Sequence, residues 1–146
     1  MKRFIVLAAA VLLLASGSLL AQDSRNYTEG SVTAVTAVRT HDGQFENYMR
    51  YLGDQYKRVM DAQKEAENIL DYQIFATIPR SPDDPDIYLT VTYANMAAFD
   101  GMQDRMDPVS RRVSGESLDQ SERSYGERGE MRRILGTELI RQQILR

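Results

Sequence analysis

Ser31-Val-Thr-Ala-Val-Thr-Ala-Val-Arg-Thr40, followed directly by His41-Asp42-Gly43-Gln44-Phe45-Glu46-Asn47-Tyr48, is the stretch that decides the fold. Its first ten positions are dense in β-branched residues, which predicts a strand over residues 31–40. The turn-forming triplet His41-Asp42-Gly43 predicts the end of that strand. From Gln44 to about Ile69, apolar residues recur at steps of three and four, which indicates a long amphipathic helix.

Two further strands are predicted over residues 70–78 and 87–93. In both segments every second residue belongs to a mainly aliphatic row, and the residues between them form a second, more polar row. Three prolines fall between them, from Pro79 to Asp86, and each lacks the backbone donor that a sheet ladder needs. We therefore expect a protruding hairpin loop there. Phe75 and Tyr88 fall on the strand faces opposite to the main aliphatic rows, so the sheet is predicted to need a cover on both faces.

The second half of the chain predicts another helical region and a last strand. Asn95 is a favourable N-cap for a short helix from Met96 to Met106. Asp107-Pro108 predicts a new helix start, and the charged, glycine-punctuated residues 109–132 predict broken helix over the surface. Residues 133–145 predict a terminal strand. Methionines at helical spacing are expected in the core: Met49, Met60, Met96, Met102 and Met106.

The predicted order is strand, helix, strand, strand, helix, strand. This is the βαββαβ order of a ferredoxin-like α+β fold, in which a four-stranded antiparallel sheet packs both helices on one face. The chain resembles the dimeric α+β barrel superfamily, which includes small antibiotic-biosynthesis-monooxygenase-like and NIPSNAP-like domains. The resemblance covers residues 31–145 as element order and is carried by the strand-to-helix stretch ending at Tyr48 and by Arg133-Ile-Leu-Gly-Thr-Glu-Leu139. It implies a homodimer whose two sheet faces enclose a barrel.

Residues 1–21 resemble a secretory signal peptide. Lys2-Arg3 precedes an uninterrupted apolar run from Phe4 to Ala15, and Ser16-Gly17-Ser18 then interrupts the helix. The apolar run is shorter than the roughly 20 residues that a bilayer-spanning helix needs. We therefore expect cleavage after Ala21 or nearby and a periplasmic or secreted protein, with a retained anchor as the alternative.

The mature chain is then expected to have a flexible leader, residues 22–30, and one domain, residues 31–146. The net charge of −3 becomes more negative when the basic signal residues are lost, and no basic patch suggests nucleic acid or an anionic membrane as a partner. The chain has no cysteine and a single histidine, so disulfides, thiol catalysis and the usual zinc sites are excluded within one subunit. We expect no metal, no cofactor and no membrane contact after signal cleavage. The clustered Asp83, Asp84 and Asp86 are expected to form a solvated acidic loop, since the calcium-loop pattern is absent.

His41 is the candidate catalytic residue, because it follows the first strand and carries the side chain that titrates near neutral pH. A polar turn residue is the simpler interpretation. The candidate ligand-binding residues are Arg39, Phe75, Tyr88 and Arg141, which belong to predicted strands. An inward-facing Arg39, Glu138 or Arg141 would need an ionic partner or a bound anion.

Three functions remain open from the sequence. The leading hypothesis is a small-molecule-binding homodimer for an apolar or anionic molecule. The alternative is a cofactor-independent monooxygenase- or isomerase-like enzyme, with His41 moving a proton and Arg39 or Arg141 holding an enolate or carboxylate. The resemblance implies Trp, Asn and His in the pockets of such enzymes, and this chain has no tryptophan. The third is a purely structural dimer whose barrel is filled by its own side chains.

Overall fold

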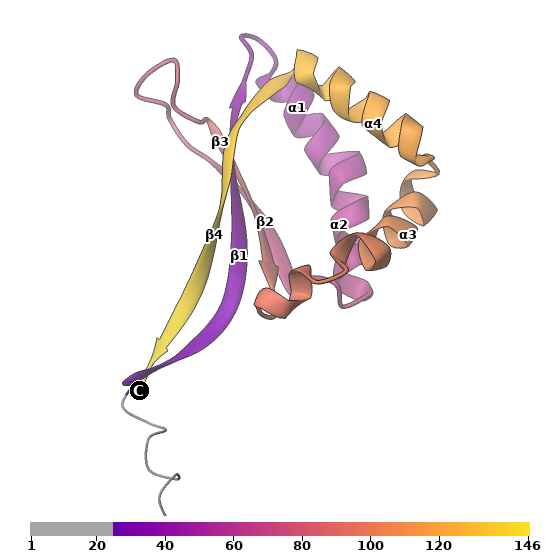
Figure 1. Cartoon of the computed structure of the whole chain (residues 1–146). Coiled ribbons are helices and arrows are strands. Elements are labelled where there is room, and N and C mark those ends of the chain that lie inside the picture. The colour runs from indigo at the N-terminus through magenta and orange to yellow at the C-terminus, as the bar shows by residue number, and fades with distance from the viewer. Residues whose placement is uncertain (1–24) are drawn as a thin grey trace, which may run out of the picture. The chain divides into compact units, whose positions relative to one another are not determined.

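The computed structural model describes residues 25–146 (Figure 1). The expected signal peptide and residues 22–24 of the expected leader lie outside this range. The described chain divides into a main unit, Glu29–Gln142, and a small unit made of residues 25–28 and Gln143–Arg146. Within the small unit, the backbone N–H of Arg146 donates to the carbonyl of Asn26 at 2.8 Å.

Four strands form one sheet in the order β2-β3-β1-β4: β1 Tyr27–Thr40, β2 Asp71–Ala76, β3 Ile87–Tyr93 and β4 Arg132–Leu145. β1 and β2 both pair antiparallel with β3. On the other side of β1, Ser31 contacts Gln142 and Thr36 contacts Thr137, so residue numbers fall along β4 as they rise along β1. The predicted ferredoxin-like α+β fold is confirmed.

The strand bounds lie within two residues of the predicted ones, except at the start of β1, and β2 is shorter than the predicted 70–78 by one residue at its start and two at its end. β3 has the predicted bounds, and β4 begins one residue before the predicted position. β1 begins at Tyr27 and not at Ser31, so the second half of the expected leader belongs to a strand. The early start depends on long-range pairing, because β4, from the far end of the sequence, lies beside β1 on the side away from β3.

The helices all lie on one side of the sheet (Figure 1). The long predicted helix is a continuous helical path with a π-helical turn in its middle: α1 Phe45–Tyr51, the π-helix η1 Leu52–Tyr56 and α2 Lys57–Glu65. It ends four residues before the predicted Ile69. A π turn inserts an extra residue into the helical repeat, which rotates the residues after it relative to the stripe that the sequence predicts.

The second helical region differs from the prediction in its boundaries. The 3₁₀-helix η2, Met96–Phe99, ends before Gly101, and α3, Met102–Ser114, runs through the Asp107-Pro108 pair that predicted a restart. The proline removes one backbone hydrogen bond from α3, and the next residue, Val109, is buried. α4, Leu118–Glu127, and the 3₁₀-helix η3, Arg128–Glu130, complete the predicted broken helix.

The hydrophobic core lies between the sheet and the helices and centres on four buried residues: Val38, Tyr48, Leu52 and Ile87. Met49 packs against this core as predicted, whereas Met96 is exposed in η2 and the prediction that it belongs to the core is wrong. In the part of the chain that the structure describes, no helix is long and apolar enough to cross a membrane.

Candidate functional site

Three of the predicted ligand-binding residues share the sheet face that points away from the helices. Val38 and Ile87 are register partners in the core, so their neighbours along each strand point to the opposite, open face. Phe75 lies directly across from Tyr88, and Tyr88 lies across from Ala37 on β1. Arg39 follows two residues later and therefore shares that face. The register thus gathers Phe75, Tyr88 and Arg39 near one end of the sheet, and we call these three residues the open-face row.

Arg141 does not join the open-face row. Its guanidinium forms an ion pair with the carboxylate of Glu29, with 2.7 Å between Nη1 and Oε2. Glu29 lies near the start of β1, whereas Arg39 lies near its end. Glu138 is exposed on β4. Arg39 is therefore the charged residue of the predicted set that lies beside the aromatic pair.

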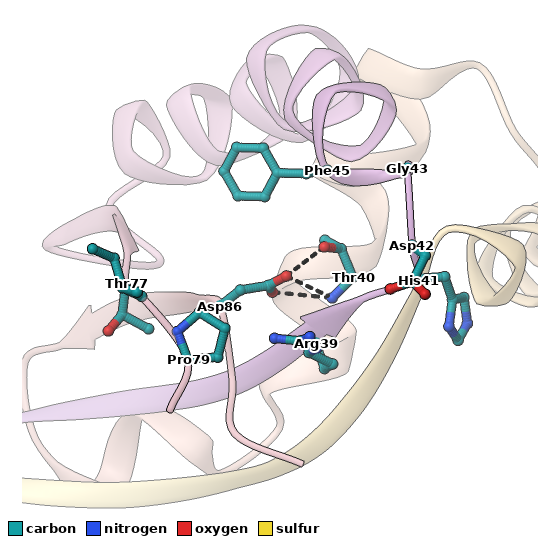
Figure 2. Close-up of a pocket in the computed structure, with 10 residues that line it drawn as sticks. Arg39, Thr40, His41, Asp42, Gly43, Phe45, Thr77, Pro79 and Asp86 are labelled. Carbon is teal, nitrogen blue, oxygen red and sulfur yellow. Dashed lines mark hydrogen bonds between the residues drawn. The ribbon is translucent and has the colours of Figure 1, made fainter. Parts of the chain in front are cut away.

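A pocket of about 340 Å³ lies at the end of β1, and Figure 2 shows residues that line it. Its walls come from the end of β1, the turn after it, the start of α1 and both ends of the β2–β3 loop. The lining residues are Arg39, Thr40, His41, Asp42, Gly43, Phe45, Thr77, Ile78, Pro79 and Asp86. Arg39 belongs both to this pocket and to the open-face row, so it connects the two.

The guanidinium of Arg39 forms no ion pair or hydrogen bond with another residue between positions 25 and 146. Its side chain is half-buried, so part of its hydration is already lost. A half-buried guanidinium beside apolar walls attracts an anionic group, and its fork geometry matches a carboxylate.

Asp86 is buried and holds the pocket together, so the prediction that it belongs to a solvated acidic loop is wrong. Its buried carboxylate accepts hydrogen bonds from the backbone N–H of Thr40, at 3.0 and 3.2 Å, and from the Thr40 hydroxyl (Figure 2). Its own N–H donates to the carbonyl of Val38, and its carbonyl accepts from Thr77. Asp86 therefore ties the β2–β3 loop to the end of β1. The sequence offered one indication that Asp86 is held by the sheet, which is its position directly before the predicted strand 87–93.

The other loop acids are also occupied by local contacts. Asp84 accepts from the backbone N–H groups of Arg80 and Ser81 at 2.9 and 3.0 Å, and the bond from Arg80 is the main reason why the pKa of Asp84 is lowered. Asp83 forms an ion pair with Arg133 at 3.3 Å. Among residues 25–146, no group of three or more histidine, cysteine or acidic side chains is arranged to hold a metal ion.

The imidazole of His41 is directed away from the pocket interior. Its Nε2 lies 3.0 Å from the carbonyl oxygen of Gly129, and Figure 2 shows the ring on the far side from Thr77 and Pro79. Because a carbonyl oxygen only accepts hydrogen bonds, Nε2 must carry the proton in this contact. The backbone N–H of His41 also donates to the carbonyl of Met131. His41 thus joins the end of β1 to the segment before β4.

Sequence reasoning missed one group of charged residues altogether. Arg128 and Arg132 lie against the rings of Tyr48, Tyr51 and Tyr125, and Arg132 is buried. Residues 109–132 predicted an exposed, charged surface, and the sequence offers no signal that one of these arginines is buried.

No protein-family model matches the sequence, and a search of curated proteins finds no match. Among solved structures, the chain is similar to HapK from Hahella chejuensis, with a TM-score of 0.50 and 9 % identity over 76 % of this chain and 91 % of that chain. It also matches a dimeric ferredoxin-like protein from an uncultured marine organism, with a TM-score of 0.44 and 11 % identity over 82 % of this chain and 90 % of that one. A dimeric ferredoxin-like protein of unknown function from Thermobifida fusca matches with a TM-score of 0.37 and 12 % identity, over 81 % and 94 % of the two chains. The predicted resemblance is confirmed at the level of the fold.

Proposed function

We propose that the mature chain is an exported homodimer that binds a small molecule with an apolar body and an anionic group. The observation that carries this proposal is the position of Arg39, which lacks an acidic partner within residues 25–146 and belongs both to the open-face row and to the lining of the pocket. Phe45, Ile78 and Pro79 supply apolar surface in the pocket. The charged residues of the lining are Arg39, Asp42 and Asp86, and the carboxylate of Asp86 is already hydrogen-bonded to Thr40. Apolar walls with a few charged or polar groups are the usual form of a small-molecule site.

The dimer is proposed from the open sheet face. Phe75 is 49 % exposed and lies beside the half-buried Tyr88, and neither ring has a helix to cover it. A second copy of the chain, packed through the same face, removes both rings from water in a symmetric interface. Such an interface also lowers the local dielectric constant around Arg39, which strengthens its attraction for an anion.

The other two hypotheses have less support. Proton transfer by His41 needs an imidazole within hydrogen-bond reach of the substrate, whereas this ring points away from the pocket and its Nε2 is hydrogen-bonded to the carbonyl of Gly129. A dimer with a purely structural role would leave the half-buried guanidinium of Arg39 without a counter-charge among residues 25–146. These contacts favour binding over catalysis and over a purely structural role.

Export is the second part of the proposal and rests on the signal-like residues 1–21. Protein recovered from the periplasm or the medium is expected to have the intact mass of a chain that begins at Gln22. Mass spectrometry of that fraction makes the measurement. A full-length mass in the membrane fraction would contradict export and leave the binding proposal to be tested separately.

Replacement of Arg39 by glutamine is expected to remove a preference for anionic ligands. Benzoate and the neutral benzamide serve as probes, because they share an apolar ring and differ in charge. We expect the wild-type protein to bind benzoate more tightly, and R39Q to lose roughly 10- to 100-fold of benzoate affinity, as for one lost charge-assisted interaction. Titration calorimetry on the mature protein makes the comparison.

Arg112→Gln is the matched control, because Arg112 is exposed on α3 and its loss changes the net charge equally. It is expected to bind benzoate as the wild type does. Equal weakening in both variants, or equal wild-type affinity for benzoate and benzamide, would contradict the role of Arg39.

A further inference from the structure

Five side chains form a second cluster of aromatic and cationic groups, separate from the pocket at the end of β1. They are Tyr48 and Tyr51 of α1, Tyr125 of α4, Arg128 of η3 and Arg132 of β4, and we call them the arginine–tyrosine stack. The Cζ atom of Arg128 lies 5.0 Å from the ring centroid of Tyr51 and 5.5 Å from that of Tyr125. The Cζ atom of Arg132 lies 5.7 Å from the ring centroid of Tyr48 and 5.0 Å from that of Tyr125. The ring of Tyr125 therefore contacts both guanidinium groups.

The stack carries two positive charges with no bound counter-charge. Neither Arg128 nor Arg132 forms an ion pair with an acidic residue in the described range. The nearby Glu116 is engaged by neutral groups, since its Oε1 accepts from Ser124 at 2.8 Å and from Gln55 at 3.5 Å. Two guanidinium groups that share one aromatic ring repel each other, and ring faces offset this repulsion only in part.

The lack of a counter-charge is most unfavourable at Arg132, because this side chain is buried. It is 7 % exposed, and its Nε is buried with no hydrogen-bond acceptor. A buried charged donor without an acceptor is strongly unfavourable, and proteins usually satisfy it with a carboxylate, a carbonyl or a bound anion. The described chain provides none of these to Nε.

We propose that the arginine–tyrosine stack binds an oxyanion, the carboxylate or phosphate group of a small molecule, between Arg128 and Arg132. Both guanidinium groups present planar N–H forks, which match the paired oxygens of such a group. Tyr48 adds a hydroxyl group beside Arg132. The oxyanion supplies the negative charge that this cluster lacks.

Tyr125 provides the route of entry. Its ring is 53 % exposed, and α4 contributes no buried residue to the protein. Moving this ring therefore breaks few apolar contacts, and it uncovers the two guanidinium groups that the ring touches. The site opens from the helical side of the main unit, whereas Arg39 lies on the open sheet face.

Inorganic phosphate and acetate, each compared with sodium chloride at equal ionic strength, test the proposal on the mature protein. We expect phosphate, acetate or both to raise the thermal unfolding midpoint in a saturable way, because a ligand that binds only the folded state stabilises it. Arg128→Gln is expected to weaken that binding at least tenfold. Arg132→Lys keeps the charge but not the fork, and the same loss is expected. A response to phosphate alone identifies a phosphate site, and a response to acetate alone identifies a carboxylate site.

Arg123→Gln is the control, since Arg123 is an exposed residue of α4 outside the stack. R123Q is expected to keep the wild-type response. The loss expected in R128Q, which leaves Arg39 intact, separates this site from the one proposed at Arg39. The proposal is overturned if neither anion stabilises the wild type beyond sodium chloride. It is also overturned if R128Q folds and keeps the full response, since the stack is then a purely structural contact.

Discussion

Replacement of Phe75 by alanine is expected to raise the dissociation constant of the proposed homodimer by roughly 10- to 100-fold. Phe75 is 49 % exposed on the open sheet face, directly across from Tyr88. Full burial of a phenylalanine side chain contributes about 1.5–3 kcal/mol, and an interface would bury only the exposed half of Phe75. A symmetric interface contains the residue twice, so the total loss is again about 1.5–3 kcal/mol. Since every 1.4 kcal/mol is tenfold, this loss corresponds to roughly 10- to 100-fold. Sedimentation equilibrium of the wild type and F75A measures both constants.

Leu118→Ala is the matched control for this experiment. Leu118 is 54 % exposed, but it lies on α4 in the helical layer, away from the open sheet face. Its removal is expected to leave the dimer unchanged. A wild-type protein that sediments as a monomer at micromolar concentration, or an equal loss in both variants, would contradict a dimer formed through the open face.

Replacement of Asp86 by alanine is expected to lower the free energy of unfolding by about 3 kcal/mol. The substitution removes the acceptor for two groups of Thr40, its hydroxyl and its buried backbone N–H. A hydrogen bond to a charged acceptor contributes about 1.5–3 kcal/mol, and a buried donor left without a partner costs about 1–3 kcal/mol. Urea unfolding of the mature protein measures the change. The β2–β3 loop is also expected to detach from β1, so D86A should bind benzoate more weakly.

Two further variants serve as a partial rescue and a control for this prediction. Asp86→Asn keeps one oxygen that can accept from Thr40 and is expected to recover part of the stability. Asp83→Ala removes a neighbouring carboxylate whose ion pair with Arg133 is at the surface, so we expect a change within about 0.5 kcal/mol. If D86A and D83A are equally stable, Asp86 does not hold the loop to β1.

The fold could be predicted because its signals are local. The alternation around Leu89 and Val91 defines β3, and β3 has the predicted bounds. The run of β-branched residues before His41 and the periodic stripe after Gln44 predict a strand followed by a helix, whatever their partners are. The same alternation placed Phe75 and Tyr88 on the face that the helices leave open, as the register shows.

The features that were not predicted depend on contacts between distant residues. Asp86 is buried only because it meets Thr40, which lies 46 positions earlier. The imidazole of His41 turns from the pocket because Gly129, 88 positions away, offers a carbonyl. Local periodicity also says nothing about Arg132, which is buried against rings from α1 and α4. The residues of the site could thus be chosen from the sequence, but their partners could not.

Native mass spectrometry of the protein purified from the exported fraction tests the proposed dimer and its ligand together. We expect the mass of two chains that begin at Gln22, together with a small anionic molecule that is released when the dimer is denatured. The same measurement on R39Q is expected to give a dimer without that molecule. A wild-type protein that is monomeric, or a dimer that releases no small molecule and binds no benzoate, would contradict the proposed function.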